Sequence, residues 1–302
     1  MEIRRLEYFV KVAEMASFSK AAVVLRMAQS TLSRQIGELE LELGQRLLLR
    51  TGRGATPTEA GLALLTHARA ILSIERHAQQ DLLDLDASPR GRIVVGLPSL
   101  VALQLGGSLV KAFRARFPMA TLTITEGLSL HLREWLVEGR VDIAVLYDPP
   151  PSPQLMVSTL GREPLVLVAP AGEKKLPATV PLQTLPRYPL VLPSAPNAIR
   201  TLLDEALRPK QIGLHIVAEV GAAHTMLSMV AQGVGYTILP ESALRIQVSR
   251  VPLQFSRLGP PGVWNTRILA LPVARPSTRL VRETVAILEK TDKADKTDKR
   301  VQ

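Results

Sequence analysis

Hydrophobic positions in residues 1–57 recur at the three- and four-residue spacing of α-helices, and short polar turns separate the runs. Within residues 18–37 this pattern predicts two packed helices, whose inner apolar positions are Ala21, Ala22 and Leu25, then Leu32, Ile36 and Leu39. The start of the second helix presents small polar side chains and one arginine outward: Gln29, Ser30, Ser33 and Arg34. Such a helix can enter the major groove of DNA and reach base edges. An ordinary three-helix bundle with a polar surface fits the spacing equally well.

Residues 58–87 predict one long helix, of ~45 Å at ~30 residues. Thr58 can cap its start, Glu59 suits its first turn, and the Pro-Arg-Gly segment at 89–91 ends it. A three–four apolar spacing makes this helix a candidate dimer interface, formed by Leu64, Ala68, Ile71, Ala78, Leu82 and Leu85. The same face could instead pack back on its own domain.

From residue 92 short β-like runs alternate with helical patterns, which indicates an α/β region with mostly parallel strands. The expected strands are 92–97, 121–126, 143–147, 165–169, 190–192, 215–220, 236–239 and 267–271. The expected helices are 102–116, 130–139, 199–207, 224–232 and 278–290. Proline-rich segments at 148–153 and 259–262 suggest two crossings between two lobes. The charged repeat over residues 291–302 predicts a disordered tail.

Composition narrows the class of protein. The 302 residues are 46% hydrophobic and contain no cysteine, which excludes disulfides, zinc–thiolate sites and thiol catalysis. No apolar run could span a membrane, and the charged N-terminus does not resemble a secretion signal, so we expect a cytoplasmic protein with no membrane partner. The net charge of +10 is unevenly spread: residues 1–90 hold 12 basic and 11 acidic side chains. DNA binding by this region must therefore rest on pattern rather than on bulk charge.

Residues 1–62 resemble the N-terminal domain of LysR-type transcriptional regulators. The stretches that carry the resemblance, in register and without a gap, are 6–9 (LEYF), 17–22 (SFSKAA), 29–36 (QSTLSRQI), 39–40 (LE), 43–44 (LG), Leu47, 49–51 (LRT), 56–58 (TPT) and 59–61 (EAG). Residues 90–290 are similar to the two-lobed effector domain of the family, including Gly-Val-Gly-Tyr at 233–236 and Leu-Pro at 239–240. Gly-Leu-Pro at 96–98 and Glu-Gly-Leu-Ser at 126–129 are most similar to nitrogen-assimilation-control-like members.

The resemblance implies an N-terminal all-α winged helix–turn–helix, a long linker helix and a C-terminal α/β, two-lobed, periplasmic-binding-protein-like effector domain. The implied boundaries are 1–58 for DNA binding, 59–89 for the linker and dimerisation helix, and 90–290 for effector binding, with lobe I about 90–162 and 266–290 and lobe II about 163–265. The implied DNA-binding residues are Ser19, Lys20, Gln29, Ser30, Thr31, Ser33, Arg34 and, in the wing, Arg50 and Arg53. The implied partners are a partly symmetric double-stranded DNA site, a second copy within a homodimer or homotetramer, and RNA polymerase.

Serine-bearing turns that follow strands are candidate effector contacts. Ligands bind beyond the carboxyl ends of parallel strands, where helix N-termini present free N–H groups, and hydroxyls there suit a small anionic ligand. The candidates are Ser99, Leu100, Ser129, His131, Ser194 and Arg200. Each serine could equally serve only to cap its helix.

Sequence signatures of catalysis are absent. There is no nucleophile elbow, Walker loop, dinucleotide fingerprint or zinc-protease helix, and the five histidines are scattered, so we expect no enzyme activity, metal or cofactor. A ligand-responsive transcriptional regulator is therefore the main hypothesis. The alternative is a cytoplasmic small-molecule-binding protein or enzyme on the same scaffold, with the N-terminal helices used only for assembly.

Overall fold

A computed structural model describes residues 1–51, 54–83, 89–170, 172, 175–245 and 252–297. The chain forms two compact units, which we describe separately. Unit 1 contains Met1–Pro89, Val137–Arg140 and Arg275–Thr278, and unit 2 contains Arg90–Leu136, Val141–Ala274 and Arg279–Gln302.

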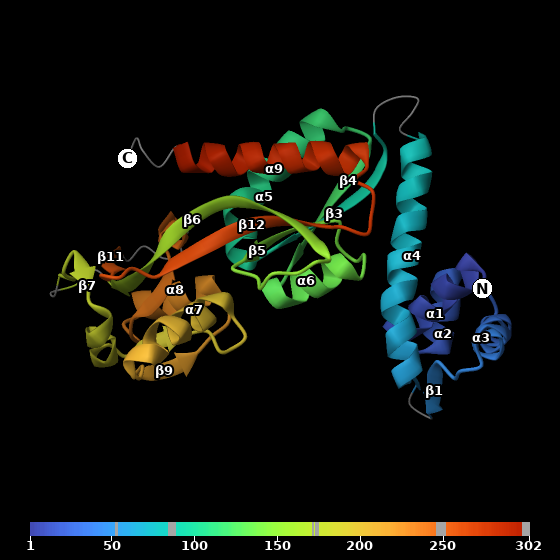
Figure 1. Cartoon of the computed structure of the whole chain (residues 1–302), viewed down its shortest axis with the longest axis horizontal. Coiled ribbons are helices and arrows are strands. Elements are labelled where there is room, and N and C mark those ends of the chain that lie inside the picture. Colours follow the sequence, from blue (N-terminus) through green and yellow to red (C-terminus); the bar gives the residue numbers. More distant parts are fainter. Residues whose placement is uncertain (52–53, 84–88, 171, 173–174, 246–251, 298–302) are drawn as a thin grey trace. The chain divides into compact units, whose positions relative to one another are not determined.

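Three short helices open unit 1: α1 (Ile3–Met15), α2 (Phe18–Leu25) and α3 (Gln29–Leu43) (Figure 1). Their apolar faces form one core, in which Phe9, Ala21, Leu32 and Ile36 are almost entirely buried. The chain turns from α2 to α3 at Arg26, whose backbone is left-handed and whose N–H donates to the last turn of α2. The predicted pair of helices is confirmed, with the predicted inner faces.

Two strands follow, where the sequence pattern had shown only helical spacing. Strands β1 (Leu48–Thr51) and β2 (Gly54–Pro57) form an antiparallel pair in which Arg50 lies opposite Ala55. The Ala55 N–H donates to the Ala16 carbonyl over 2.9 Å, so β2 lies against the end of α1. A Cβ on Gly54 would lie 2.3 Å from that carbonyl oxygen, and its φ of +147° also favours glycine. Glycine therefore allows the wing to approach the helices.

The long helix α4 runs over Glu59–Leu83, and the last residues of the expected 58–87, 84–87, lie outside the described residues. The Thr58 hydroxyl accepts the Gly61 N–H at 2.9 Å, which confirms the predicted cap. Of the candidate dimer positions, Leu64, Ala68 and Ile71 pack against the core of unit 1, as the alternative interpretation of this helix expected. Ala78 and Leu82 lie beyond that core; Leu82 is 68% exposed, and Leu85 lies outside the described residues.

The described strands of unit 2 form one large sheet and a two-stranded one. The large sheet has the order β4 (Ala120–Glu126), β3 (Gly91–Leu97), β5 (Ile143–Tyr147), β12 (Trp264–Pro272), β6 (Leu155–Pro170), β11 (Leu253–Leu258) and β7 (Thr179–Val180), with β10 (Thr237–Pro240) also paired to β6. The small one pairs β8 (Leu190–Leu192) with β9 (Ile216–Glu219). The described α-helices of unit 2 are α5 (Ser99–Arg116), α6 (Ser129–Val137), α7 (Ala198–Leu207), α8 (Ala223–Ala231) and α9 (Arg279–Thr297). Unit 2 also contains the 3₁₀ turns η1 (Leu182–Arg187), η2 (Arg208–Lys210) and η3 (Glu241–Arg245).

Unit 2 has two lobes because it has two hydrophobic cores. In lobe I, α5 and α9 pack on strands β3 and β5, and in lobe II, α7 and α8 pack around β6, β8 and β10. Strands β6 and β12 run side by side from one lobe toward the other (Figure 1). The first half of β6 pairs with β12, and its second half pairs with β10 and β11 of lobe II. The chain thus crosses between the lobes twice, as expected from the sequence, and the two crossing segments pair with each other as a two-stranded ribbon of β6 and β12.

Two expectations for this region are wrong. The sheet is mixed rather than mostly parallel, because β12 is antiparallel to both β5 and β6, and β10 and β11 are antiparallel to β6. The tail expected to be disordered from residue 291 is helical to Thr297, while 298–302 lie outside the described residues. A contact distant in sequence holds this last part of α9: the Asp292 carboxylate lies 3.1 Å from the buried Arg267 guanidinium.

Candidate functional sites

The first turn of α3 is the centre of the candidate nucleic-acid interface. Gln29 and Ser30 are exposed there, Arg34 is exposed in the next turn, and Thr31 and Ser33 are half-buried beside them. The Ser19 hydroxyl donates to the Gln29 side-chain carbonyl over 2.8 Å, which ties the start of α2 to the start of α3. That bond leaves the Gln29 amide N–H groups to meet an acceptor outside the protein. Residues predicted from two separate segments are therefore brought together on one surface.

The acidic side chains of α3 are held away from this first turn. Arg5 of α1 contacts Glu38 at 2.9 Å and Glu42 at 3.4 Å, and its side chain is only 20% exposed. The N-terminal ammonium also bonds Glu42 and lowers the pKa of that carboxyl, which keeps it ionised. Arg34 has only a 4.0 Å approach to Glu38 and stays 70% exposed. An exposed guanidinium with a weak internal partner is free to reach a base edge or a phosphate.

The wing places a second arginine beside the helices. The Arg50 guanidinium lies 4.5 Å from the centroid of the Phe18 ring at the start of α2, in a cation–π contact. Lys20 is exposed on the same helix, and its backbone N–H donates to the Ser17 hydroxyl. Arg53 lies outside the described residues. The described part of the predicted DNA-binding set thus gathers around the starts of α2 and α3.

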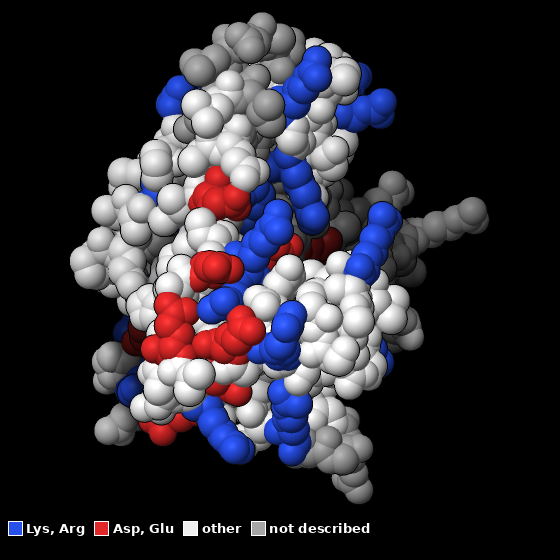
Figure 2. Space-filling view, turned by 90° about the vertical axis from the view of Figure 1, so that its right-hand side faces the viewer, with Lys and Arg blue, Asp and Glu red and all other residues white. Residues whose placement is uncertain are grey.

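The charge on this part of the surface is mixed. Figure 2 shows Asp and Glu side chains gathered beside Lys and Arg side chains, without one continuous basic surface. This agrees with the near balance of charge in residues 1–90. The described residues thus offer few cationic side chains for phosphate contacts, so we expect two copies on two half-sites to bind DNA much more tightly than one.

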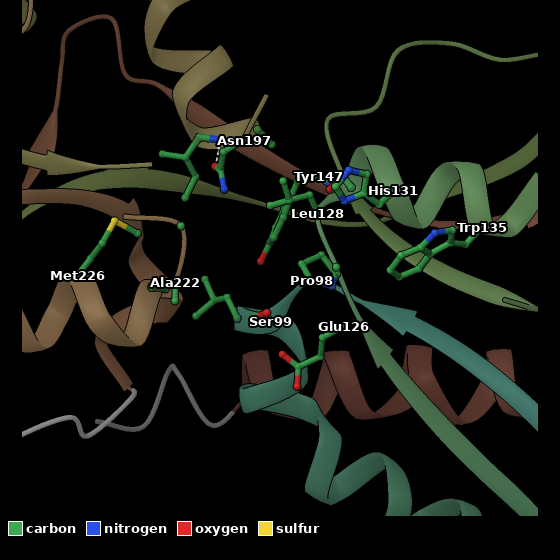
Figure 3. A pocket seen from close by; sticks show the side chains of 17 residues that line it. Pro98, Ser99, Glu126, Leu128, His131, Trp135, Tyr147, Asn197, Ala222 and Met226 are labelled. Atoms are coloured by element: carbon green, nitrogen blue, oxygen red, sulfur yellow. Dashed lines mark hydrogen bonds between the residues drawn. The ribbon is translucent and has the colours of Figure 1, made fainter. Parts of the chain in front are cut away.

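A cavity of about 520 Å³ lies between the lobes of unit 2. Figure 3 shows His131 and Trp135 of lobe I on one side of it and Ala222 and Met226 of lobe II on the other. The His131 and Trp135 rings stack at 6.1 Å between centroids. Most of the lining is apolar, which is typical of a small-molecule site with a few orienting polar groups.

Four of the six predicted effector contacts line this cavity: Ser99, Leu100, Ser129 and His131. The other two, Ser194 and Arg200, are not among its lining residues. The Arg200 guanidinium bonds Glu219 at 2.9 Å and Asp204 at 3.1 Å, and the Glu219 bond is the main cause of its raised pKa. An arginine held by two carboxylates on its own surface is a poor partner for a ligand anion. The structure thus does not bring Ser99 and Ser194 together around one cavity.

Helix starts converge on the cavity. Ser99, Ser129, Ala198 and Ala223 all line it, and each is the first residue of a helix, from α5 to α8 in order. Two polar side chains there also have structural tasks. The Ser129 hydroxyl accepts the Tyr147 N–H at 2.9 Å, and the Asn197 side chain caps α7 by accepting the Ile199 N–H. The Asn197 side-chain oxygen is therefore used as a cap, while the Ser129 hydroxyl keeps its own proton to donate.

Sequence reasoning missed two residues that bear on ligand chemistry. Glu126, at the end of β4, lines the cavity and is exposed. Tyr147, at the end of β5, lines it too but is only 7% exposed, and its hydroxyl has no hydrogen-bond partner among the described residues. Burial raises the pKa of Tyr147 well above its usual range, so this hydroxyl remains a donor. Both residues end strands, and applying the strand-end rule beyond serine-bearing turns would have found them.

Two features of other protein classes are missing from the described residues. No helix in that part of the chain combines the length and apolar character needed to cross a bilayer. The same part holds no group of three or more His, Cys, Asp or Glu side chains placed to bind a metal ion.

Comparisons with known families match both units. Residues 3–62 match the family described as bacterial regulatory helix-turn-helix protein, lysR family, and residues 86–292 match the LysR substrate binding domain. The nitrogen assimilation regulatory protein nac of Escherichia coli is 35% identical over 288 residues, which cover 94% of this chain and 93% of the relative.

Solved structures share the fold. A full-length OxyR variant from Pseudomonas aeruginosa has a TM-score of 0.77 at 22% identity, and the match covers 97% of this chain and 95% of that one. Full-length CbnR in complex with its target DNA has a TM-score of 0.56 at 24% identity, and the match covers 97% of this chain and 100% of that one. Both likenesses include the two-lobed unit as well as the N-terminal helices.

Proposed function

The chain belongs to the LysR family of bacterial transcriptional regulators, and we propose that α3 and the wing bind a partly symmetric DNA site under the control of a small molecule bound between the lobes. The similarity of the chain to the nitrogen assimilation regulatory protein agrees with the nitrogen-assimilation-control-like subgroup expected from the sequence. Membership of the family supports a role as a sequence-specific regulator. It favours this role over the alternative, in which the protein only binds or converts a small molecule and the N-terminal helices serve for assembly.

One observation carries the assignment of the DNA-contacting surface. The first turn of α3 is exposed, is tied to α2 through Ser19 and Gln29, and has its acidic neighbours bound by Arg5. Ser30, Ser33 and Arg34 would contact base edges, while Lys20, Arg50 and the α3 N-terminus would contact phosphates. Thr31 lies half-buried beside Ser30, and we assign DNA contacts to Thr31 and Arg53 on the resemblance.

Assembly supplies the second half-site. The family resemblance implies a homodimer within a homotetramer, and the exposed part of α4 supports a role for that helix in pairing. Ala78 and Leu82 continue the face whose earlier residues pack on the unit 1 core, and Leu82 is left without cover toward the end of this apolar stripe. A second copy of α4 would bury it.

The remaining partners follow from the regulatory role. The cavity between the lobes would hold the effector, with Ser99, Leu100, Ser129 and His131 in contact with it. Binding that favours one arrangement of the lobes would shift the DNA-bound state only if affinity differs between the two arrangements. RNA polymerase is the expected further partner, the cytoplasm the expected compartment, and no catalytic step is proposed.

Footprinting of the purified full chain on the DNA upstream of its own gene tests this proposal. We expect protection of two half-sites about one helical turn, or a multiple of one, apart. The matched control is the variant Arg34→Ala, which should lose the footprint at concentrations that protect DNA with the unchanged chain. Binding without any preferred position would contradict the assignment.

A further inference from the structure

The charges that line the cavity constrain the chemical class of its ligand. Among its 17 lining residues Glu126 is the one carboxylate, and none is a lysine or arginine. Glu126 is exposed and forms no ion pair with the described residues. A ligand that carried only negative charge would therefore meet an unpaired carboxylate and no lysine or arginine, and His131 is the one lining side chain that can itself become a cation.

The helix starts, in contrast, favour a negatively charged group on the ligand. Each of α5, α6, α7 and α8 begins at the cavity, where first-turn N–H groups lack partners within the helix and the helix dipole is positive. The Tyr147 side chain also lines the cavity, and its hydroxyl, buried and without a partner among the described residues, could serve as a further donor if its ring turned toward a ligand. A ligand that carried only positive charge would leave these donors unused.

The surroundings of the cavity do not reverse this balance. Arg200 is bound to Asp204 and Glu219 and is not a lining residue. A smaller cavity of about 190 Å³ shares Ser129 and Tyr147 with the first, and its one arginine, Arg133, is accompanied by two acidic residues. No excess of cationic side chains lines either cavity for a ligand with several negative charges, such as a dicarboxylate or a phosphate.

A ligand with one charge of each sign satisfies both demands. We propose that the cavity binds an α-amino acid with an apolar side chain, its ammonium facing Glu126 and its carboxylate facing the helix starts. The apolar side chain would lie against the remaining lining, which includes Leu128, Ile199 and Met226. This inference rests on the proposed effector role of the cavity and names the chemical class that the effector has.

Isothermal titration of the full chain tests the charge requirement. The probes are L-leucine, L-methionine and L-phenylalanine, each beside the matching acid without the amine and the matching amine without the carboxylate. We expect at least one amino acid to bind, and its two singly charged counterparts to bind at least about tenfold more weakly, since each loses a hydrogen-bonded charge.

Two variants separate the ammonium contact from general effects. Glu126→Gln should weaken binding of the amino acid about tenfold, and it should leave the acid without the amine bound as well as before or better. Glu134→Gln is the matched control, because Glu134 is exposed on α6 and is not a lining residue. It should leave every affinity unchanged.

Three results would overturn the inference: binding of no amino acid, equal binding of the acid without its amine, or an unchanged affinity in Glu126→Gln. A gel shift with the upstream DNA, run on the same preparation, distinguishes the two levels of failure. If DNA binding is intact, only the ligand class is wrong. If DNA binding is absent, the proposed function fails as well.

Discussion

The Arg267 guanidinium on β12 lies 3.1 Å from the Asp292 carboxylate on α9, and the two side chains are only 2% and 1% exposed. Glu163 on β6 approaches the same guanidinium at 3.7 Å. A buried charge is costly unless it is paired, so these residues depend on one another. The pair joins the last helix to the ribbon that connects the lobes.

Removing this guanidinium should destabilise unit 2. We expect Arg267→Met to lower the free energy of unfolding by ~3–5 kcal/mol, because it leaves two buried carboxylates without their cation. Urea-induced unfolding of the full chain measures the change. The control is Arg116→Met, which breaks an exposed ion pair between Arg116 at the end of α5 and Glu283 on α9, the helix that carries Asp292. It should lower the free energy of unfolding by less than ~1 kcal/mol. Equal costs for the two variants would show that the buried pair adds no net stability.

Asp148 should make stability depend on pH. Desolvation raises the pKa of Asp148 above its usual value, although the Thr266 N–H that bonds its carboxylate acts in the other direction. The folded state then binds its proton more tightly than the unfolded state, so stability is lost as pH rises through the folded pKa. Asp148→Asn, which tolerates the φ of +39°, should be more stable than the unchanged chain at a pH of about 7.

The Tm difference between this variant and the unchanged chain should shrink as the pH falls toward about 4, where the carboxyl becomes protonated. Differential scanning calorimetry across this range measures the difference. A gap that widens at low pH would mean that the Thr266 hydrogen bond outweighs desolvation.

Arg34 should contribute to sequence discrimination. Arg34→Ala is expected to weaken binding to the footprinted site by ~1–3 kcal/mol, because an exposed guanidinium can form a bidentate contact with a base. Gel shifts at fixed salt, with cognate and random DNA, measure this. Arg208→Ala, an exposed arginine of unit 2, is the control for loss of charge. An equal loss on both DNAs would reassign Arg34 to a phosphate contact.

Leu82 should contribute to self-association through α4. Leu82→Lys would place a charge in an apolar contact and weaken the dimer by ~1–3 kcal/mol, or about tenfold or more in dissociation constant. Light scattering over a concentration series measures the assembly. Met119→Lys, which changes a side chain of similar exposure after α5, should have no effect. If the Leu82→Lys chain keeps the mass of the unchanged chain on dilution, this part of α4 is not the interface.

Local patterns predicted much of unit 1. The packed helices, the Thr58 cap and the outward first turn of α3 depend on neighbours three or four residues away, which the sequence displays directly. The wing strands depend instead on contact with a distant segment, the Ala16 carbonyl that Ala55 bonds. That is why helical spacing alone misled there.

In unit 2 the errors share the same physical origin. The end of α9 is polar, and the contact of Asp292 with Arg267 on another element, which the sequence pattern does not display, helps to explain why Asp292 is buried in a helix. The first half of β6 carries the polar residues Ser158, Thr159 and Arg162, so its sequence lacks the apolar pattern of a strand. Its strand conformation depends on pairing with β12, which is distant in sequence. Arg200 is the exception, since its partner Asp204 lies one helical turn away and this pairing could have been predicted from the sequence.

The pairing of Glu163 with Asn265 across β6 and β12 places the two ends of lobe II next to each other. Lobe II is therefore an insertion in the chain of lobe I, and its core draws on residues up to Val263. The core of lobe I needs Leu269, Leu280 and Leu288, which leave the ribosome last. Because domains fold as units during synthesis, the inserted lobe can fold first, while the lobe that encloses it waits for the final helix.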